Sequence, residues 1–138
     1  MPARALKFRF SRRRAAHLRL GRRGEALACR VLRAAGNEVL ARNYQARHGE
    51  IDIVARDAET LCFVEVKTRR RSINSTPGEA VGTAKRGRIC AAAREYLRSI
   101  GIPAVTYRFD IIEVVLPQRG AIRVEHHQSA FVAERSLF

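Results

Sequence analysis

Residues 49–69 read GEIDIVARDAETLCFVEVKTR, and this stretch decides the fold of the whole chain. It contains two apolar runs, residues 51–55 and residues 61–66, with a short polar segment between them. This pattern predicts two β-strands joined by a turn. Both faces of the runs are largely apolar, so we expect helices to cover the sheet. Three ionisable side chains lie in or beside these runs: Asp52, Glu65 and Lys67.

The alternation of side chains along a strand decides which of these groups can meet. Glu65 and Lys67 are two residues apart, so they point to the same face. The turn allows two registers, which place Asp52 opposite either Val64 or Glu65. In the second register the two carboxylates lie roughly 5 Å apart.

Two carboxylates this close repel each other, and burial increases the cost. Such a pair is stable if one group is protonated, if a cation lies between them, or if water reaches them. Hard divalent ions such as Mg²⁺ bind carboxylate and carbonyl oxygens together with water. The pattern therefore indicates a metal site, with Lys67 beside it to hold a phosphate oxygen or an attacking water. On spacing alone, a solvated salt bridge at a strand end is the alternative.

Asp52, followed by Glu65-Val66-Lys67 on the next strand, resembles the D...(D/E)-x-K signature of the PD-(D/E)XK, or restriction-endonuclease-like, nuclease superfamily. Over residues 21–131 the chain also resembles the small YraN-like family of predicted endonucleases. The segments that carry this second resemblance are Gly24-Glu25, Arg42-Asn43-Tyr44, residues 49–52, residues 63–69 and Arg108-Phe109-Asp110. Ile51 precedes Asp52 where the superfamily label has proline, which loosens the first motif but keeps its carboxylate.

The resemblance implies a restriction-endonuclease-like fold. By analogy with archaeal Holliday-junction resolvases, it also implies metal-dependent cleavage of branched or structured DNA. The implied ligands of Mg²⁺ or Mn²⁺ are Asp52, Glu65, the Val66 carbonyl and Glu25. Lys67 would orient the nucleophilic water and offset charge on the phosphorane. For Glu25, stabilisation of the first helical turn by the helix dipole is the alternative.

Composition points to a polyanionic partner. The 138 residues are enough for one domain, and the net charge is +14. Residues 1–23 hold nine basic residues and no acidic one. We therefore expect a basic, flexible extension over residues 1–20 and a single nuclease-like domain over residues 21–138, with DNA favoured over RNA as the partner. An Arg-rich tail that makes no specific contact is the alternative.

Cysteine usage and hydropathy bear on the compartment. The odd number of cysteines, Cys29, Cys62 and Cys90, each in an apolar stretch, predicts buried free thiols in a reducing, cytoplasmic environment. No apolar run approaches the roughly 18 residues that a membrane span needs, so no membrane partner is expected.

The remaining elements follow from periodicity. A helix is predicted over residues 24–35, with Glu25 at the head of its apolar stripe, and a second over residues 83–99, with Thr83 as N-cap and Gly101 at its end. Further strands are expected over residues 39–44, 105–116 and 121–126. This order predicts an α/β domain with a mixed central β-sheet flanked by helices.

Several basic residues near the predicted site are candidates for binding phosphates. Arg69 and Arg70 are expected in a loop after the second strand, and Lys85 and Arg88 in the first turn of the second helix, where anions bind readily. A solvated charge run is the alternative for both groups. A non-catalytic nucleic-acid-binding module is the competing function. An RNA- or ribosome-associated protein would explain the charge but not the hairpin. A junction-cutting enzyme needs two active sites, which a homodimer would supply.

Three further residues near these elements have separate predictions. Glu50 shares the face of Asp52 and is expected to form a salt bridge with Lys67, with a role as a second metal ligand as the alternative. Asp110 is expected to be structural, paired with Arg108 or a backbone donor. His126 and His127 are adjacent, so their side chains should face opposite ways and not form a metal pair.

Overall fold

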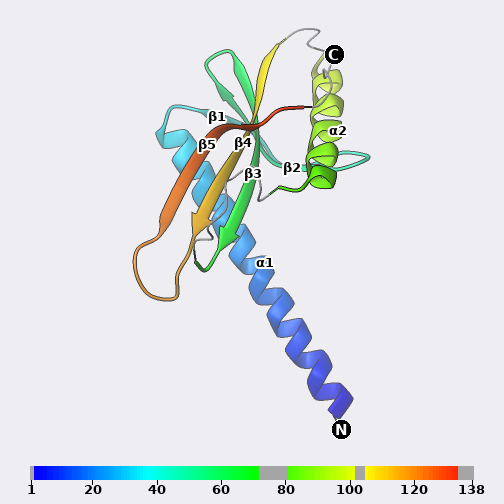
Figure 1. Cartoon of the computed structure of the whole chain (residues 1–138), viewed down its shortest axis with the longest axis vertical. Coiled ribbons are helices and arrows are strands. Elements are labelled where there is room, and N and C mark those ends of the chain that lie inside the picture. The colour runs from blue at the N-terminus through cyan, green and yellow to red at the C-terminus, as the bar shows by residue number, and fades with distance from the viewer. Residues whose placement is uncertain (1, 72–80, 102–104, 134–138) are drawn as a thin grey trace.

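The computed structural model describes residues 2–71, 81–101 and 105–133, with side chains from residue 14 onward. It is a five-stranded mixed sheet with a helix on each face (Figure 1). The elements are, in order, α1 (Pro2–Ala34), β1 (Glu38–Gln45), β2 (Glu50–Asp57), β3 (Thr60–Arg69), α2 (Thr83–Ile100), β4 (Thr106–Val115) and β5 (Arg123–Phe131). This confirms the predicted α/β class and is consistent with a restriction-endonuclease-like core.

The strands lie in sequence order, β1-β2-β3-β4-β5. Only the β3–β4 pair is parallel, and the other three pairs are antiparallel. Parallel neighbours need a crossover connection, and the segment containing α2 provides it. The sheet is therefore built from local hairpins except at its centre, where β3 and β4 meet.

The β2–β3 hairpin has the second of the two predicted registers. Arg56 pairs with Leu61 and Ile53 pairs with Val64. Continued by one residue, this register sets Asp52 opposite Glu65, and the pairing ends just before that point. A shift of the pairing register by one residue would move every side chain of β3 to the opposite face of the sheet. Asp52 and Glu65 would then no longer share a face.

Two apolar clusters hold the layers together, one on each face of the sheet. On the α2 face, Ile89, Ala92, Ala93 and Leu97 pack against Phe63, Phe109 and Ile111. On the α1 face, Ala28, Cys29 and Leu32 pack against Ile53, Val64 and Ile112. The apolar stripe predicted on the first helix is therefore buried as expected, whereas the stripe of α2 is buried only as far as Leu97, and Ile100 at its end is exposed.

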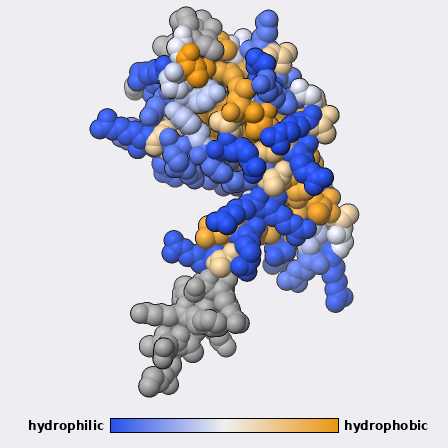
Figure 2. All heavy atoms as spheres, turned by 180° about the vertical axis from the view of Figure 1, so that it is seen from behind, coloured by the Kyte–Doolittle hydropathy of each residue, from blue (hydrophilic) through white to orange (hydrophobic). Residues whose placement is uncertain are grey.

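Helix α1 begins at Pro2, well before the predicted start near residue 24. Its N-terminal part extends away from the sheet (Figure 1), and Figure 2 shows hydrophilic side chains where the helix leaves the body. Ala, Leu and Arg favour helix, and Pro is well tolerated at a first helical position. This extension was not predicted, because residues 1–23 are rich in arginine and the apolar stripe expected of a packed helix begins at Glu25. The domain boundary at residues 20/21 stays a prediction.

Smaller differences concern element ends. Thr83 is already inside α2, and Gly82 caps it without a side-chain bond, whereas Gly101 ends the helix in the left-handed conformation as predicted. Arg69 belongs to β3 and not to a loop. β5 continues to Phe131, five residues past the predicted end at residue 126.

The three cysteines are unbridged, as predicted, but only two are buried. Cys29 and Cys62 lie in the core, whereas Cys90 is half-buried. Neither α1 nor α2, the helices of the described part of the chain, has a segment long and apolar enough to cross a membrane.

Candidate active site

A pocket of about 270 Å³ lies where α1, β2, β3 and the first turn of α2 meet. All four elements contribute polar side chains to it. Every predicted metal ligand and the predicted catalytic lysine line this pocket: Glu25, Asp52, Glu65, Val66 and Lys67. Lys85, predicted as a phosphate contact, lines it as well. The structure therefore brings together residues that are up to 60 positions apart in the sequence.

A glycine allows α1 to approach the sheet at this point. A Cβ atom at Gly24 would collide with the Thr68 side chain of β3, so only glycine fits without a rearrangement. The next residue, Glu25, is half-buried and lines the pocket. The close approach explains why the pair Gly24-Glu25 belongs to the sequence motif.

Asp52 stands at the point where β2 and β3 stop pairing. Its Oδ2 accepts a hydrogen bond of 2.8 Å from the Val66 backbone N–H. Burial raises the pKa of Asp52 to about 8 from its ordinary 3.8, the negative charge of Glu65 adds to the increase, and the Val66 bond opposes it. The carboxyl groups of Asp52 and Glu65 also hydrogen-bond to each other, which is the close approach that the second register predicts.

Glu25 completes a group of three carboxyls. Burial raises the pKa of Glu25, and a hydrogen bond from Asn43 lowers it in part, while the charge of Glu65 raises it further. Asn43 lies two residues before the end of β1 and has a positive φ of 50°. We refer to Glu25, Asp52 and Glu65 as the acidic centre. Glu65 raises the pKa of both Asp52 and Glu25, and Glu25 also raises that of Asp52, so negative charge is in excess in this group.

Two lysines partly offset that charge, and they differ in their distance from Glu65 and in the direction of their pKa shifts. Lys67 Nζ lies 3.7 Å from Glu65 Oε1, whereas Lys85 Nζ forms a closer ion pair with the same oxygen. Burial lowers the pKa of Lys67, and the neighbouring Lys85 lowers it further. For Lys85, burial also lowers the pKa, but hydrogen bonding and attraction to Glu65 outweigh it, so the net shift is upward. Lys67 is therefore the easier of the two to deprotonate.

The donor set fits a hard divalent cation. Mg²⁺ and Mn²⁺ are bound by carboxylates and keep several waters, and the pocket offers carboxylates on three elements with room for solvent. The pKa of Asp52 stays raised, which indicates that the two lysines do not fully offset the negative charge around it. A divalent ion would bind in competition with the Lys85 ammonium on Glu65. The Val66 N–H contacts Asp52, whereas a role for the Val66 carbonyl stays a prediction.

The predicted phosphate contacts divide between two places. Arg69 pairs with Val115 at the end of β3, and the exposed Arg70 donates from Nη1 to the Leu116 carbonyl at 3.4 Å. Both lie beyond Lys67 on the same strand end. Arg88 lines a second groove, which it shares with Lys85. Residues 72–80, which include part of the predicted basic loop, lie outside the described residues.

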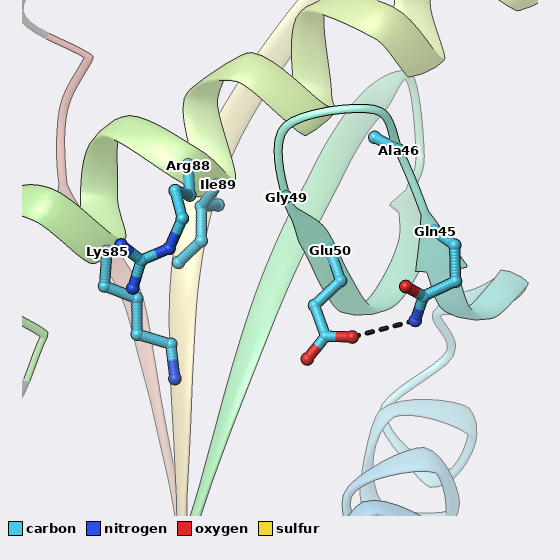
Figure 3. Close-up of a pocket in the computed structure, with 7 residues that line it drawn as sticks. All are labelled: Gln45, Ala46, Gly49, Glu50, Lys85, Arg88 and Ile89. Carbon is cyan, nitrogen blue, oxygen red and sulfur yellow. Dashed lines mark hydrogen bonds between the residues drawn. The ribbon is translucent and has the colours of Figure 1, made fainter.

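The second groove, of about 440 Å³, lies between the β1–β2 turn and α2 (Figure 3). The Arg47 N–H donates to Glu95 at 2.8 Å, and a Cβ at Gly49 would collide with the Arg88 carbonyl, so the turn is seated tightly on the helix. Glu50 accepts a hydrogen bond of 2.8 Å from Gln45, not from Lys67 as predicted. Glu50 lines this groove, and the ion pair that Lys67 forms is with Glu65.

Asp110 is structural, as predicted. It is fully buried and accepts hydrogen bonds of 3.0 Å from Arg108 Nε and from the Ser129 N–H. His126 Nε2 lies 2.8 Å from the same carboxylate. Burial alone would raise the pKa of Asp110, but these hydrogen bonds outweigh it and hold the pKa below its ordinary value. Arg108 also reaches Asp57 at 3.0 Å. We refer to these five residues as the Asp110 network.

Residues of α1 before Glu25 were missed as part of the site. His17, Leu20 and Gly21 line the pocket with the acidic centre. The signal was present, because His17, Gly21 and Glu25 follow one another at a spacing of four residues, which places them on one helical face. It could be used only once the helix was known to extend past residue 24.

Comparison with known proteins gives one consistent result. The model of the uncharacterised protein family UPF0102 matches residues 24–114. A UPF0102 protein of Parafrankia sp. is 46% identical over 113 residues, covering 82% of this chain and 96% of the relative. Relatives from Symbiobacterium thermophilum, 44% identical over 115 residues (83% and 98%), and Streptomyces griseus, 48% identical over 108 residues (78% and 91%), carry the same family name.

Proposed function

The chain belongs to the uncharacterised protein family UPF0102, the YraN-like family whose motifs it carries, and from this premise we propose that it is a metal-dependent endonuclease acting on DNA. The proposal includes membership of the PD-(D/E)XK superfamily and a preference for branched or structured DNA. One observation carries it. The carboxyls of the acidic centre converge with Lys67 and Lys85 in one open pocket, at the end of the hairpin that holds the D...(D/E)-x-K motif.

Each residue has a role in this proposal. The acidic centre holds Mg²⁺ or Mn²⁺, and the bound ion supplies a Lewis acid for a phosphate oxygen and a more acidic water. Lys67, whose pKa is lowered, orients that water and offsets charge on the phosphorane. Lys85, which pairs with Glu65, would be available to a phosphate oxygen if Glu65 held the ion. Arg69, Arg70 and Arg88 bind flanking phosphates.

The charge distribution supports a nucleic-acid partner. In the part of α1 that precedes Glu25, four arginines with described side chains are exposed: Arg14, Arg19, Arg22 and Arg23. They lie on the part of α1 that also supplies His17 and Leu20 to the pocket, so a polyanion held by them would pass the acidic centre. Such contacts are independent of sequence and weaken with salt. Unbridged cysteines, two of them buried, support a reducing, cytoplasmic location.

A binding module without catalysis is the second candidate, and one observation favours it. The Lys85 ammonium already pairs with Glu65, so part of the acidic centre is compensated without a metal. In that case Asp52 would stay protonated near neutral pH, and the basic surface alone would act.

Nicking of plasmid DNA and of four-way junctions, with and without Mn²⁺, separates the two candidates. The endonuclease proposal expects metal-dependent cleavage by the wild type and none by Lys67→Ala, with equal DNA binding by both. Glu59→Gln, which removes an exposed carboxylate from the β2–β3 turn, is the matched control and should cut normally. Binding of DNA with no cleavage of any DNA or RNA form would assign the module.

A further inference from the structure

A second group of metal-ligating side chains lies on β4 and β5, outside the pocket of the acidic centre. Glu113, Glu125 and His127 each place one ligand atom within 4.8 Å of the other two. Glu113 and His127 are half-buried, and Glu125 is exposed. None of the three lines the pocket that holds Asp52 and Glu65. The group is therefore a separate feature of the sheet.

The strand register forces two of these carboxylates together. Glu113 pairs directly with Glu125 in the antiparallel β4–β5 ladder. Like charges directly opposite each other destabilise a sheet, and the ion pair of Glu125 with Arg123 offsets part of that cost. Lys67 is the neighbour of Glu113 on β3, but it lies beside the acidic centre and is drawn toward Glu65.

The atoms of Glu125 and His127 are arranged as two ligands of one ion would be. Glu125 Oε1 accepts a hydrogen bond of 2.7 Å from Arg123, which leaves Oε2 directed at His127. The distance from Oε2 to His127 Nε2 is 3.5 Å, too long for a good hydrogen bond. Two donors bound tetrahedrally at about 2.1 Å lie about 3.4 Å apart.

His127 Nε2 is itself an unusual atom. It is buried from solvent, and no described residue forms a hydrogen bond with it. A buried ring nitrogen without a partner is costly, and an imidazole nitrogen is a common ligand of transition metals. The adjacent His126 faces Asp110, so His127 is the histidine of this pair that is available to the two glutamates.

We propose that Glu113, Glu125 and His127 bind a divalent transition-metal ion of the Zn²⁺ class. One imidazole nitrogen with two carboxylates suits Zn²⁺ and its neighbours, whereas Mg²⁺ is bound by oxygen ligands. The bound ion neutralises the Glu113–Glu125 pair, links β4 to β5 and adds positive charge next to the strand that carries Lys67. It is distinct from the ion of the acidic centre in both ligands and metal preference, and it does not depend on the proposed nuclease activity.

Isothermal titration of the full chain with Zn²⁺ alone tests the site. We expect binding by the wild type that weakens at least about tenfold in His127→Ala and in Glu113→Gln, since even loss of an outer-shell partner costs 10–100-fold. His48→Ala removes an exposed histidine from the β1–β2 turn and is the matched control, with unchanged binding expected. The double variant Asp52→Asn/Glu65→Gln disables the acidic centre and should also keep this binding.

Substitution with Co²⁺ gives a second readout, because the visible d–d absorption of Co²⁺ responds to its ligands. Loss of a ligand in His127→Ala should change this absorption, and His48→Ala should keep it. If His127→Ala fails to fold, Glu113→Gln decides, since its carboxamide preserves size. The proposal is overturned if the wild type binds no Zn²⁺ or if the His127 and Glu113 variants bind it as tightly. Loss of Zn²⁺ binding in Asp52→Asn/Glu65→Gln overturns it too, by assigning the ion to the acidic centre.

Discussion

Asp52 and Asp110 are the same chemical group buried in the same sheet, yet their pKa values move in opposite directions. Asp110 receives hydrogen bonds from Arg108, His126 and Ser129, and its pKa is lowered. Asp52 receives one from Val66 and faces Glu65, and its pKa rises to about 8. Burial raises the pKa of both, so the difference comes from the neighbours.

The difference separates a structural carboxylate from a functional one. The Asp110 network supplies donors and a guanidinium, so the negative charge is stabilised by the fold itself. The acidic centre places carboxyls against each other and leaves them near solvent, so the fold is less stable than it would be without the charge. Natural proteins keep such strain where a ligand offsets it.

The largest effect on folding is expected from Asp110→Asn. This variant removes the charged partner of the Arg108 Nε group. Removing one member of a buried ion pair costs about 3–5 kcal/mol of unfolding free energy. Urea denaturation at neutral pH measures it. Asp57→Asn removes the more exposed partner of the same arginine and should cost only about 0–1 kcal/mol. Equal losses in the two variants would show that burial of Asp110 is not what matters.

Asp52→Asn should have the reverse profile. Cleavage is expected to fall about 10²–10³-fold or more, as when a key electrostatic group is removed from an active site, while the unfolding free energy stays the same or rises. Single-turnover nicking and urea denaturation on the same preparation test both parts. A variant that cuts normally, or one that unfolds as readily as Asp110→Asn, would remove the distinction between the two aspartates.

The pH dependence of stability should also differ. The folded state holds the Asp52 proton up to about pH 8, whereas the unfolded chain releases it near 3.8, so the folded state binds more protons in between and stability falls as pH rises through that window. Asp110 acts oppositely, because its stabilisation is present above its unfolded pKa and is lost as pH falls through its lower folded pKa.

Denaturation at about pH 5, 7 and 9 compares wild type with Asp52→Asn. The advantage of the variant should grow from the lowest pH to the highest. Mn²⁺ should reduce that advantage most at high pH, because the ion replaces the proton on Asp52. An advantage that is constant across pH would show that Asp52 ionises normally in the fold.

A smaller effect is expected from Gly49→Ala, which perturbs the start of β2 without touching a charge. The added Cβ meets the Arg88 backbone carbonyl, so the turn must move off α2 at a cost of about 1–3 kcal/mol, with slower cleavage. Gly87→Ala points into open space inside α2 and should stabilise by about 0.5–1 kcal/mol. If both variants have the same melting temperature in calorimetry, the close packing of the β1–β2 turn against α2 does not contribute to stability.

Much of the fold was predictable from sequence because burial imposes periodicity. The hairpin of residues 49–69 was predicted with two possible registers, and the structure has the one that brings Asp52 and Glu65 together. Asp110 was predicted to be structural because nothing in the local spacing brings it to the metal site and Arg108 lies two residues away. These inferences needed only contacts between near neighbours in the chain.

Other features depended on distant parts of the chain. The pairing of Lys85 with Glu65 requires the crossover to bring the start of α2 to the end of β3, and no local pattern encodes that. His126 reaches Asp110 across a bulge in the β4–β5 ladder, which alternation alone does not predict. Helix α1 extends through a segment with no buried stripe, so neither its length nor the place of His17 could be inferred.

Titration of the protein with Mn²⁺ near pH 8, followed by electron paramagnetic resonance of the free ion, tests most directly whether the acidic centre is a metal site. Wild type should bind Mn²⁺, and Glu65→Gln should bind it at least about tenfold more weakly, because one carboxylate ligand becomes an amide. Equal affinity in the two proteins, or no bound Mn²⁺ in the wild type, would contradict the account.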